Sequence, residues 1–271
     1  MKIALVQMRT GIDPARNIDD AEALIREAAA NGARLIATPE TTHLMERDGD
    51  KLFDLLCPPE EDPALVRFSD VAESLGITLV VGSLALLGAD GRAVNRQHVF
   101  RPDGKLLATY DKIHMFDVRI DSGEVYSEST NYAPGNRAVV VDAAGTKIGL
   151  SICYDVRFAY LYRKLALAGA TILTVPSAFT KPTGRAHWEV LLRARAIETG
   201  SFVIAPAQGG VHEDGRKTWG HSMVIGPWGE IIAHKDDDKP GLLYAEIDPV
   251  EAEKARARIP ALAGGREVEG P

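Results

Sequence analysis

The sequence predicts an α/β domain whose sheets are mixed rather than purely parallel. Short apolar runs alternate with stretches that repeat apolar residues at helical spacing, which is the pattern of strands and helices packed in layers. Some predicted strands, such as 84–87 and 94–100, follow one another without a helix between them, so they are expected to pair antiparallel. With no repeat, low-complexity segment or linker, we expect one domain at 1–258 and a tail at 259–271 that could act as a dimer arm.

The N-terminal part is predicted to contain strands at 3–7, 35–38 and 77–81. Asp-Pro pairs at 13–14 and 62–63 start two helices, because Asp caps a helix N-terminus and Pro fits the first turn. These helices end at Asn31-Gly32 and at Gly76, residues that tolerate a left-handed backbone. Glu40 follows the second strand directly, at an end where open α/β sheets bind ligands.

The middle of the chain is predicted to contain hairpins and one long irregular segment. Turns at 89–92 and 101–105 join three consecutive strands. The segment 110–135 shows no periodic pattern, and such a long run inside a domain is usually functional. Strands at 139–141 and 147–153 are expected to pair around a turn.

Cys153 lies where a strand is predicted to meet a helix. The apolar run 148–152 ends at this cysteine, and the next helical stretch covers 161–167. A thiolate is favoured near a helix N-terminus, which makes Cys153 a candidate nucleophile. The alternative is that it serves as a small buried apolar residue, as most free cysteines do.

The C-terminal part continues with strands and two helices. A loop containing Pro182 and Gly184 is expected to lead into a helix at 189–199, and Asp248-Pro249 is expected to start the last helix. The predicted strands are 171–175, 202–205, 221–225, 230–233 and 242–247.

Composition excludes several classes of partner. The net charge of −7 argues against binding to nucleic acid or to an anionic membrane surface. Two cysteines do not make a disulfide framework, which fits a reducing compartment. The N-terminal apolar run is too short for a signal peptide, and no run approaches the ~20 residues of a membrane span. We therefore expect a cytoplasmic protein.

Three common chemistries lack their motifs. None of the seven histidines pairs with another at i, i+4 on a predicted helix, and there is no Cys-x-x-Cys for a metal. Neither glycine-rich phosphate-binding loop is present. A serine hydrolase would need a G-x-S-x-G elbow, which is also missing.

The remaining candidate chemistry uses a cysteine nucleophile assisted by a carboxylate and a lysine. Acyl transfer needs a thiolate, a group that moves its proton, and positive charge where the oxyanion forms. Glu40, Lys112 and Cys153 each follow an extended segment, so their strands could deliver them to one edge of a sheet. Taken singly, Glu40 could equally be a solvated loop carboxylate and Lys112 a surface cation.

Three short sequence motifs, occurring in a fixed order along the chain, resemble those of a known family. They are Pro39-Glu40, the string Asp-Lys-Ile-His-Met-Phe-Asp at 111–117, and Cys-Tyr-Asp-Val-Arg-Phe at 153–158. Through them the chain resembles the carbon–nitrogen hydrolase (nitrilase) superfamily over nearly its whole length. The resemblance implies a four-layer α-β-β-α sandwich with mixed sheets, assembled as a homodimer or higher homo-oligomer, with no cofactor and no metal.

The resemblance also assigns catalytic roles. Cys153 would be the nucleophile, and Glu40 the general base that takes the thiol proton and later activates water. Lys112, together with the backbone N–H of Tyr154, would hold the oxyanion. Glu128 matches a second glutamate that the family places near the lysine, where it would orient the lysine or the substrate amide.

The strings at 176–179, 183–198 and 219–223 resemble one branch of the superfamily, the Nit branch. Its members hydrolyse amides of small 2-oxo acids, and the block from Thr183 is closer to enzymes that act on deaminated glutathione than to omega-amidases that act on 2-oxoglutaramate. The resemblance thus implies amide hydrolysis to a carboxylate and ammonia through a Cys thioester. Hydrolysis of N-carbamoyl compounds or nitriles, or a catalytically silent binding protein, are the alternatives.

The substrate of such an amidase would carry a carboxylate, and Arg157 is our candidate to bind it, because guanidinium pairs with carboxylate as a fork. The alternative for Arg157 is an ion pair with Asp155 or Glu198. Motif position further suggests that Phe179, Thr183 and His187 line the pocket. The branch usually has Pro-Glu after Arg-Phe; here Ala159-Tyr160 stands there, which bears on the pocket wall.

Overall fold

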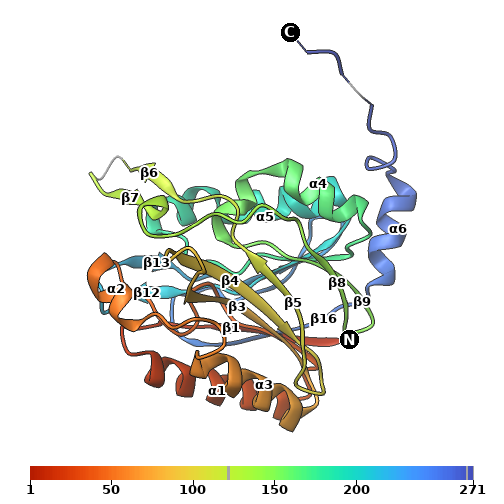
Figure 1. The fold of residues 1–271 in the computed structure, drawn as a ribbon. Coiled ribbons are helices and arrows are strands. Elements are labelled where there is room, and N and C mark those ends of the chain that lie inside the picture. The colour runs from red at the N-terminus through yellow and green to blue at the C-terminus, as the bar shows by residue number, and fades with distance from the viewer. Residues whose placement is uncertain (121–122, 267, 271) are drawn as a thin grey trace.

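The computed structural model describes residues 1–120, 123–266 and 268–270, and the chain forms four layers, with two sheets between two pairs of helices (Figure 1). Helices α1 (Pro14–Ala30) and α3 (Pro63–Leu75) cover the outer face of one sheet. Helices α4 (Ala159–Leu167) and α5 (Lys181–Thr199) cover the other. The predicted α-β-β-α sandwich is confirmed. Residues 121–122, within the predicted irregular segment, and 267 and 271, within the predicted tail, lie outside the described residues.

Each of the two main sheets has six strands. The first has the order β16-β1-β2-β3-β4-β5. Its strands are β1 (Lys2–Gln7), β2 (Leu35–Ala37), β3 (Thr78–Leu87), β4 (Ala93–Phe100), β5 (Leu106–Asp111) and β16 (Gly241–Glu246). The second has the order β15-β14-β11-β10-β9-β8. Its strands are β8 (Val140–Ala143), β9 (Thr146–Gly149), β10 (Ile172–Thr174), β11 (Phe202–Ala205), β14 (Met223–Ile225) and β15 (Ile231–His234).

Both sheets are mixed, as the sequence predicts. In the first sheet β1, β2 and β3 are parallel, whereas β16, β4 and β5 join through antiparallel pairs. In the second, β9, β10 and β11 are parallel and the strands outside them pair antiparallel. Parallel strands at the centre need coverage on both faces, which explains their almost continuous apolar sequences.

The main core lies between the sheets. Alternate residues of β1 point to opposite faces, so Ile3 and Leu5 enter the inter-sheet cluster while Ala4 and Val6 pack under α1 and α3. Ile148 and Ile172, each fully buried, supply the facing sheet's contribution. One strand therefore contributes to two cores at once.

The structure corrects the predicted start of α5. The expected loop at Pro182 and Gly184 is helical, and the helix starts at Lys181 rather than at residue 189, with Thr180 at its N-cap. Proline fits the first turn of a helix because the N–H it lacks would have no partner there. Gly184 packs against Trp219, where an added Cβ would lie 2.4 Å from the indole, so close approach explains the glycine.

Other corrections concern element length and short elements. The predicted strands 77–81 and 84–87 form the single strand β3, with an irregular register between Val81 and Leu84. Strand β9 ends at Gly149, before the predicted residue 153. Short elements that the pattern did not predict are α2 (Gly49–Leu55), β6 (Asp117–Arg119), β7 (Val125–Ser127), the 3₁₀ turn η1 (Glu128–Thr130), β12 (Gly209–Val211) and β13 (Lys217–Trp219).

The C-terminal part ends in α6 (Val250–Arg258), which begins close to the predicted Asp248-Pro249. Beyond it, the described tail residues are mostly exposed and extend away from the body of the molecule (Figure 1). Arg163 of α4 donates to the Leu262 carbonyl at 2.9 Å. Among the helices of the described residues, none is long and apolar enough to cross a membrane.

Candidate active site

Strand ends from both sheets deliver polar residues to one place between them. Glu40 follows β2, Lys112 follows β5, and Cys153 follows β9 after three buried residues. Strands β2 and β5 run in the same direction in the first sheet, and the residues after them meet Cys153, which follows β9 of the second sheet, in one cavity. All three side chains are buried, with 4%, 2% and 7% of their residue surfaces exposed.

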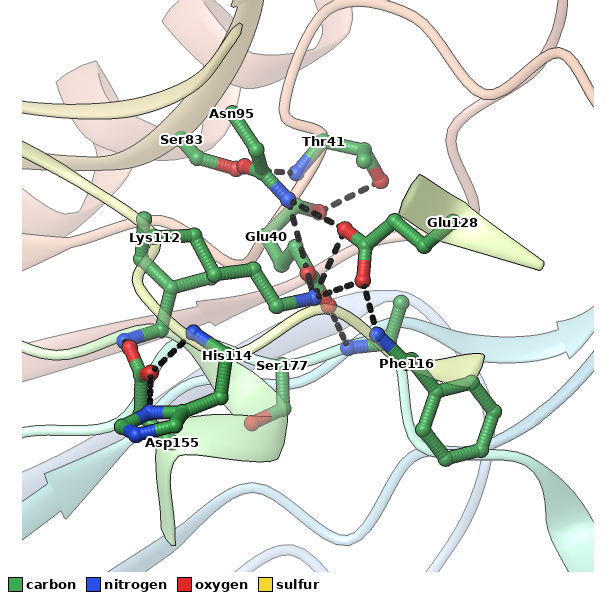
Figure 2. Close-up of polar contacts among 12 residues, drawn as sticks. Glu40, Thr41, Ser83, Asn95, Lys112, His114, Phe116, Glu128, Asp155 and Ser177 are labelled. Carbon is green, nitrogen blue, oxygen red and sulfur yellow. Dashed lines mark hydrogen bonds and ion pairs between the residues drawn. The ribbon is translucent and has the colours of Figure 1, made fainter. Parts of the chain in front are cut away.

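Lys112 lies between two carboxylates (Figure 2). Its Nζ lies 2.8 Å from Oε1 of Glu40, and 2.9 and 2.8 Å from the two carboxylate oxygens of Glu128. The Phe116 backbone N–H donates to Oε2 of Glu128 at 2.6 Å. The ammonium is therefore held on both sides, by a glutamate from each of two distant loops.

Cys153 begins the 3₁₀ turn η2 (Cys153–Arg157) with a left-handed backbone, φ +50°. Its N–H donates to the Pro176 carbonyl at 2.9 Å. A non-glycine residue in this region is uncommon and costs energy, so the position indicates a site shaped for chemistry rather than for stability. The next N–H, of Tyr154, lies in the first turn of η2, where a helical N–H has no partner within the helix.

The Glu40 carboxylate holds the reacting groups together. Oε1 accepts from Lys112 and from Nδ2 of Asn95, and Oε2 accepts from the Ala178 backbone N–H at 2.8 Å. The Cys153 thiol lies near enough to this carboxylate for the Glu40 charge to help raise its pKa, after burial. A lysine, an asparagine side chain and a backbone N–H thus converge on one glutamate.

Burial and charge set the protonation states. Burial raises the pKa of Glu40, but the Lys112 charge and the hydrogen bonds together lower it by a larger amount. The pKa of Glu40 therefore lies below its ordinary value of 4.5. Burial and the Glu40 charge raise the pKa of the Cys153 thiol well above 9.0, although Lys112 opposes this. Burial lowers the pKa of Lys112, but Glu128 and Glu40 raise it well above 10.5. At neutral pH the site holds a neutral thiol, an ionised glutamate and a charged lysine.

Asp155 connects the turn of the nucleophile to the loop of the lysine. Its Oδ2 accepts from the Tyr110 hydroxyl at 2.6 Å and from the Ile152 N–H at 2.9 Å. Its Oδ1 accepts from the His114 N–H at 3.1 Å and lies 2.6 Å from Nδ1 of that ring (Figure 2). The side chain is fully buried, and it fixes η2 relative to the residues around Lys112.

A second set of hydrogen bonds holds the loop that carries Glu40. The N–H of Thr41, which has φ +53°, donates to Ser83 Oγ at 2.8 Å, and Gln208 Nε2 donates to the Glu40 carbonyl at 2.9 Å. Gly82 lies so close that an added Cβ would be 2.0 Å from the Thr38 carbonyl oxygen. This glycine therefore serves the close approach of two backbones.

A cavity of about 190 Å³ opens onto these groups. Among the residues predicted to bind substrate, Tyr154, Phe179 and Thr183 line it, together with Glu40, Lys112, Glu128 and Cys153. The other two predicted binding residues, Arg157 and His187, do not belong to its lining.

Arg157 instead contacts His187, whose Nδ1 lies 3.2 Å from its Nη2, and its guanidinium lies 5.7 Å from the ring centroids of Tyr154 and Phe179. In the described residues it forms neither predicted ion pair. Asp155 is occupied by Tyr110 and His114, and Glu198 pairs with Arg195. Arg157 therefore supports the aromatic wall from behind.

Asn95, Arg47 and Arg216 are among the lining residues that sequence reasoning missed. Asn95 donates to Glu40 at 3.0 Å and to Glu128 at 3.4 Å. Its neighbours Arg96, Gln97 and His98 are polar as well, so the local sequence did not single it out. Arg47 and Arg216 also line the cavity, and nothing in their local sequence marks them.

Tyr160, at the position where the branch pattern has glutamate, is exposed, and its hydroxyl contacts Nε2 of His114. His114 in turn stacks on Phe158 with ring centroids 3.5 Å apart. The departure from the branch pattern thus affects the outer side of the His114 ring and leaves the position of Cys153 intact.

Within the part of the chain that the structure describes, one group of side chains could hold a metal ion. His221, His234 and Asp236 place one ligand atom each within 4.8 Å of the others, although their spacing in sequence matches no metal motif. None of the three lines the cavity around Cys153.

Comparison with known proteins agrees with this geometry. The family model described as carbon-nitrogen hydrolase matches residues 2–257. A relative named deaminated glutathione amidase, from Synechocystis, is 40% identical over 269 residues, covering 96% of each chain. A relative named omega-amidase NIT2, from Homo sapiens, is 35% identical and covers 96% of this chain and 92% of its own.

A solved structure shows the same fold. The NitFhit protein of C. elegans superposes with a TM-score of 0.91 at 33% identity, covering 98% of this chain and 65% of that longer one. The predicted resemblance is confirmed: this chain belongs to the carbon–nitrogen hydrolase family.

Proposed function

We propose that this protein is a cysteine-dependent amidase that hydrolyses the amide of a small 2-oxo acid through a thioester. The observation that carries the proposal is the buried Cys153 thiol in one cavity with Glu40, a carboxylate that pairs with Lys112. A base, a nucleophile and a fixed positive charge in one cavity are the groups that acyl transfer requires.

The first half-reaction forms the thioester. The Cys153 sulfur attacks the amide carbon while the thiol proton passes to Glu40, since the thiol is neutral and the carboxylate ionised at rest. The oxyanion receives hydrogen bonds from Lys112 Nζ and the Tyr154 N–H. Glu40 then gives its proton to the departing amine, and the C–N bond breaks.

The second half-reaction restores the enzyme. Glu40, ionised again, takes a proton from water as the water oxygen attacks the thioester carbon. The C–S bond breaks, the sulfur regains the proton from Glu40, and the acid leaves. Glu128 holds Lys112 in place with two hydrogen bonds throughout, so that Glu40 does not have to act as its only partner.

The names of the relatives support 2-oxo acid amides, with deaminated glutathione as our first candidate and 2-oxoglutaramate as the second. The cavity is smaller than the ~300–1,000 Å³ typical of ligand pockets. A cavity of that size suits a short acyl group, so a larger leaving amine would lie toward the opening of the cavity. The leaving group is ammonia for 2-oxoglutaramate and cysteinylglycine for deaminated glutathione, and both release 2-oxoglutarate.

The proposal is tested by following 2-oxoglutarate release from both substrates. We expect Cys153→Ala to abolish turnover, and Lys112→Ala to lower kcat by about 10²–10³, as loss of an oxyanion donor does. Cys57→Ala is the matched control, since that half-buried thiol does not line the cavity. Mass spectrometry of the quenched wild type should find the acyl group on Cys153. Retained activity in Cys153→Ala would contradict the mechanism.

The alternatives give different products. A hydrolase of N-carbamoyl compounds would release carbon dioxide together with ammonia, and a nitrile hydrolase would convert a nitrile but leave the matching amide slow. A silent binding protein would bind 2-oxo amides without releasing 2-oxoglutarate. Because Glu40, Lys112 and Cys153 meet in one cavity, the structure offers no local reason for silence.

Location and assembly belong to the same proposal. The free cysteines Cys57 and Cys153 support a cytoplasmic, reducing environment. We further propose a homodimer with one hydrolase domain at 1–258 and a dimer arm at 259–271. The exposed apolar side chains of Ile259 and Val268 support the arm, because such side chains gain free energy when a partner covers them.

A further inference from the structure

This inference rests on the proposed function and concerns how the enzyme recognises the substrate's carboxylate. The reacting end of the cavity cannot do so. It holds the carboxylates of Glu40 and Glu128 against the single ammonium of Lys112, so the local charge is negative and would repel another anion. Arg157, the candidate from sequence, is outside the lining and contacts His187.

Two arginines from different loops line the same cavity as Cys153. Arg47 lies just before α2, and Arg216 lies in the turn between β12 and β13. The two loops meet: Nη1 of Arg47 lies 3.8 Å from the place where a Cβ on Gly215 would be. Two arginines that are far apart in sequence thus bring their guanidinium groups to one cavity.

Arg216 is held in a fixed orientation. Its Nε donates to Oδ2 of Asp214 at 2.6 Å, and its own N–H donates to Oδ1 of that residue at 2.9 Å. The Asp214 side chain is fully buried, whereas 26% of the Arg216 side chain is exposed. Among the described residues Arg216 has no other ion pair and Arg47 has none, so the Nη groups stay available to a ligand.

The Arg216 charge reaches into the site. It lowers the pKa of the Tyr132 hydroxyl, a group that Glu128 and Glu40 influence in the opposite direction, although burial raises that pKa most. Tyr132 lines the cavity and therefore lies within range of both ends. One end of the cavity thus holds the groups for acyl chemistry, and the other offers two guanidinium groups, with Asp214 holding Arg216 and Glu46 also in the lining.

We propose that Arg216, held by Asp214, and Arg47 form the site that binds the substrate's carboxylate while the amide reaches Cys153. A guanidinium pair offers several N–H donors in a planar fork, which matches a carboxylate. The substrate class is therefore an amide that carries an anionic group, and Asp214 is a positioning residue that acts through Arg216.

The test compares an anionic with a neutral substrate. Wild type, Arg216→Gln and Arg47→Gln are assayed with 2-oxoglutaramate and with pentanamide, which has the same chain length and no carboxylate. We expect KM for 2-oxoglutaramate to rise about 10–100-fold in Arg216→Gln, as for loss of a hydrogen bond to a charged group. Its kcat should change less. Turnover of pentanamide, or its inhibition constant if the wild type does not hydrolyse it, should stay within twofold.

Arg34→Gln is the matched control. Arg34 is exposed and precedes β2, whereas Glu40 follows that strand, so the substitution removes one positive charge at the opposite end. Its KM values should match the wild type. Deaminated glutathione has a second carboxylate on its glycine, so a rise in KM for this substrate alone would assign the arginines to that group and still support the site.

Equal effects on the anionic and neutral ligands, or none on either, in a variant that melts like the wild type would overturn the inference. The proposed function would survive that result as long as the wild type releases 2-oxoglutarate and Cys153→Ala does not. Conversely, a wild type that hydrolyses no amide would refute the proposed function. The anion site would still be supported if the wild type bound 2-oxoglutarate more tightly than pentanamide and Arg216→Gln lost this preference.

Discussion

Lys112 is the residue on which the protonation of the site depends. Its charge keeps Glu40 ionised despite burial, and burial together with the Glu40 charge keeps the Cys153 thiol protonated. A thiol beside an ionised base avoids a permanently charged, easily oxidised nucleophile. In the proposed mechanism the same ammonium also stabilises the oxyanion.

These protonation states predict a flat pH profile. Glu40 has its pKa below 4.5 and Cys153 above 9.0, so none of the three groups titrates between these values. We expect kcat/KM for 2-oxoglutaramate to be constant across that window and to fall on both sides of it. A bell centred near pH 7 would contradict the assignment of Glu40 as base.

Stability should follow the same groups. The folded-state pKa of Glu40 is depressed, so its contribution is present above pH 4.5 and is lost as the pH falls through the folded value. The folded-state pKa of Lys112 is raised, so its contribution is present below pH 10.5 and is lost as the pH rises further. Thermal melts of the wild type and of Glu40→Gln across the acid range measure the first effect, which the variant should lack.

At the scale of elements, short connections do most of the positioning. The turn η2, the loop after β5 and the loop after β2 carry the three reacting residues, while the strands before them supply rigid anchors. Asp155 joins η2 to the Lys112 loop through Tyr110, Ile152 and His114. Catalytic geometry therefore depends on a residue that does not touch the substrate.

We expect Asp155→Asn to lower kcat by about 10²-fold, since small misplacements of reacting groups have effects of this size. An amide nitrogen cannot accept hydrogen bonds, so at least one buried donor loses its partner and the free energy of unfolding should fall by about 1–3 kcal/mol. Asp142→Asn, on an exposed position of β8, is the control. A change in KM without a change in kcat would argue against positioning of the nucleophile.

At the scale of the whole molecule, the two sheets form one core and bring the site together between them. Side chains of β1 and β2 pack against those of β9 and β10, and Cys153 itself belongs to this cluster. The site thus rests on the best-packed part of the fold, which limits motion of the nucleophile. The loops that carry Arg47 and Arg216 lie farther out, toward the opening.

The proposed dimer arm leads to a prediction about assembly. The described tail residues beyond α6 are mostly exposed and hold few contacts, chiefly that of Arg163 with Leu262. Deleting residues 259–271 should therefore leave the melting temperature within a few degrees and, if the tail bridges two copies, shift a dimer toward monomer in sedimentation experiments. An unchanged dimer would remove the tail from the interface.

Sequence alone predicted much of the fold and four side chains that line the candidate site, Glu40, Lys112, Glu128 and Cys153. Helix starts at Asp13-Pro14 and Asp62-Pro63, and the strands around 3–7 and 202–205, are local features that side-chain chemistry and periodicity determine. Local patterns failed for three-residue strands such as β12 and β13, which are too short to show alternation. They also failed at Pro182, where a helix start resembles a loop.

The sequence by itself thus determined which groups we propose to react: a cysteine where a strand meets a helix, a glutamate and a lysine after strands, and a family pattern joining them. Only the tertiary structure decided what surrounds them. It put Arg157 behind the pocket wall and brought Arg47 beside Gly215, next to Arg216. The physical reason is that loop-to-loop proximity depends on how two sheets pack, and no local propensity in either loop encodes the other's position.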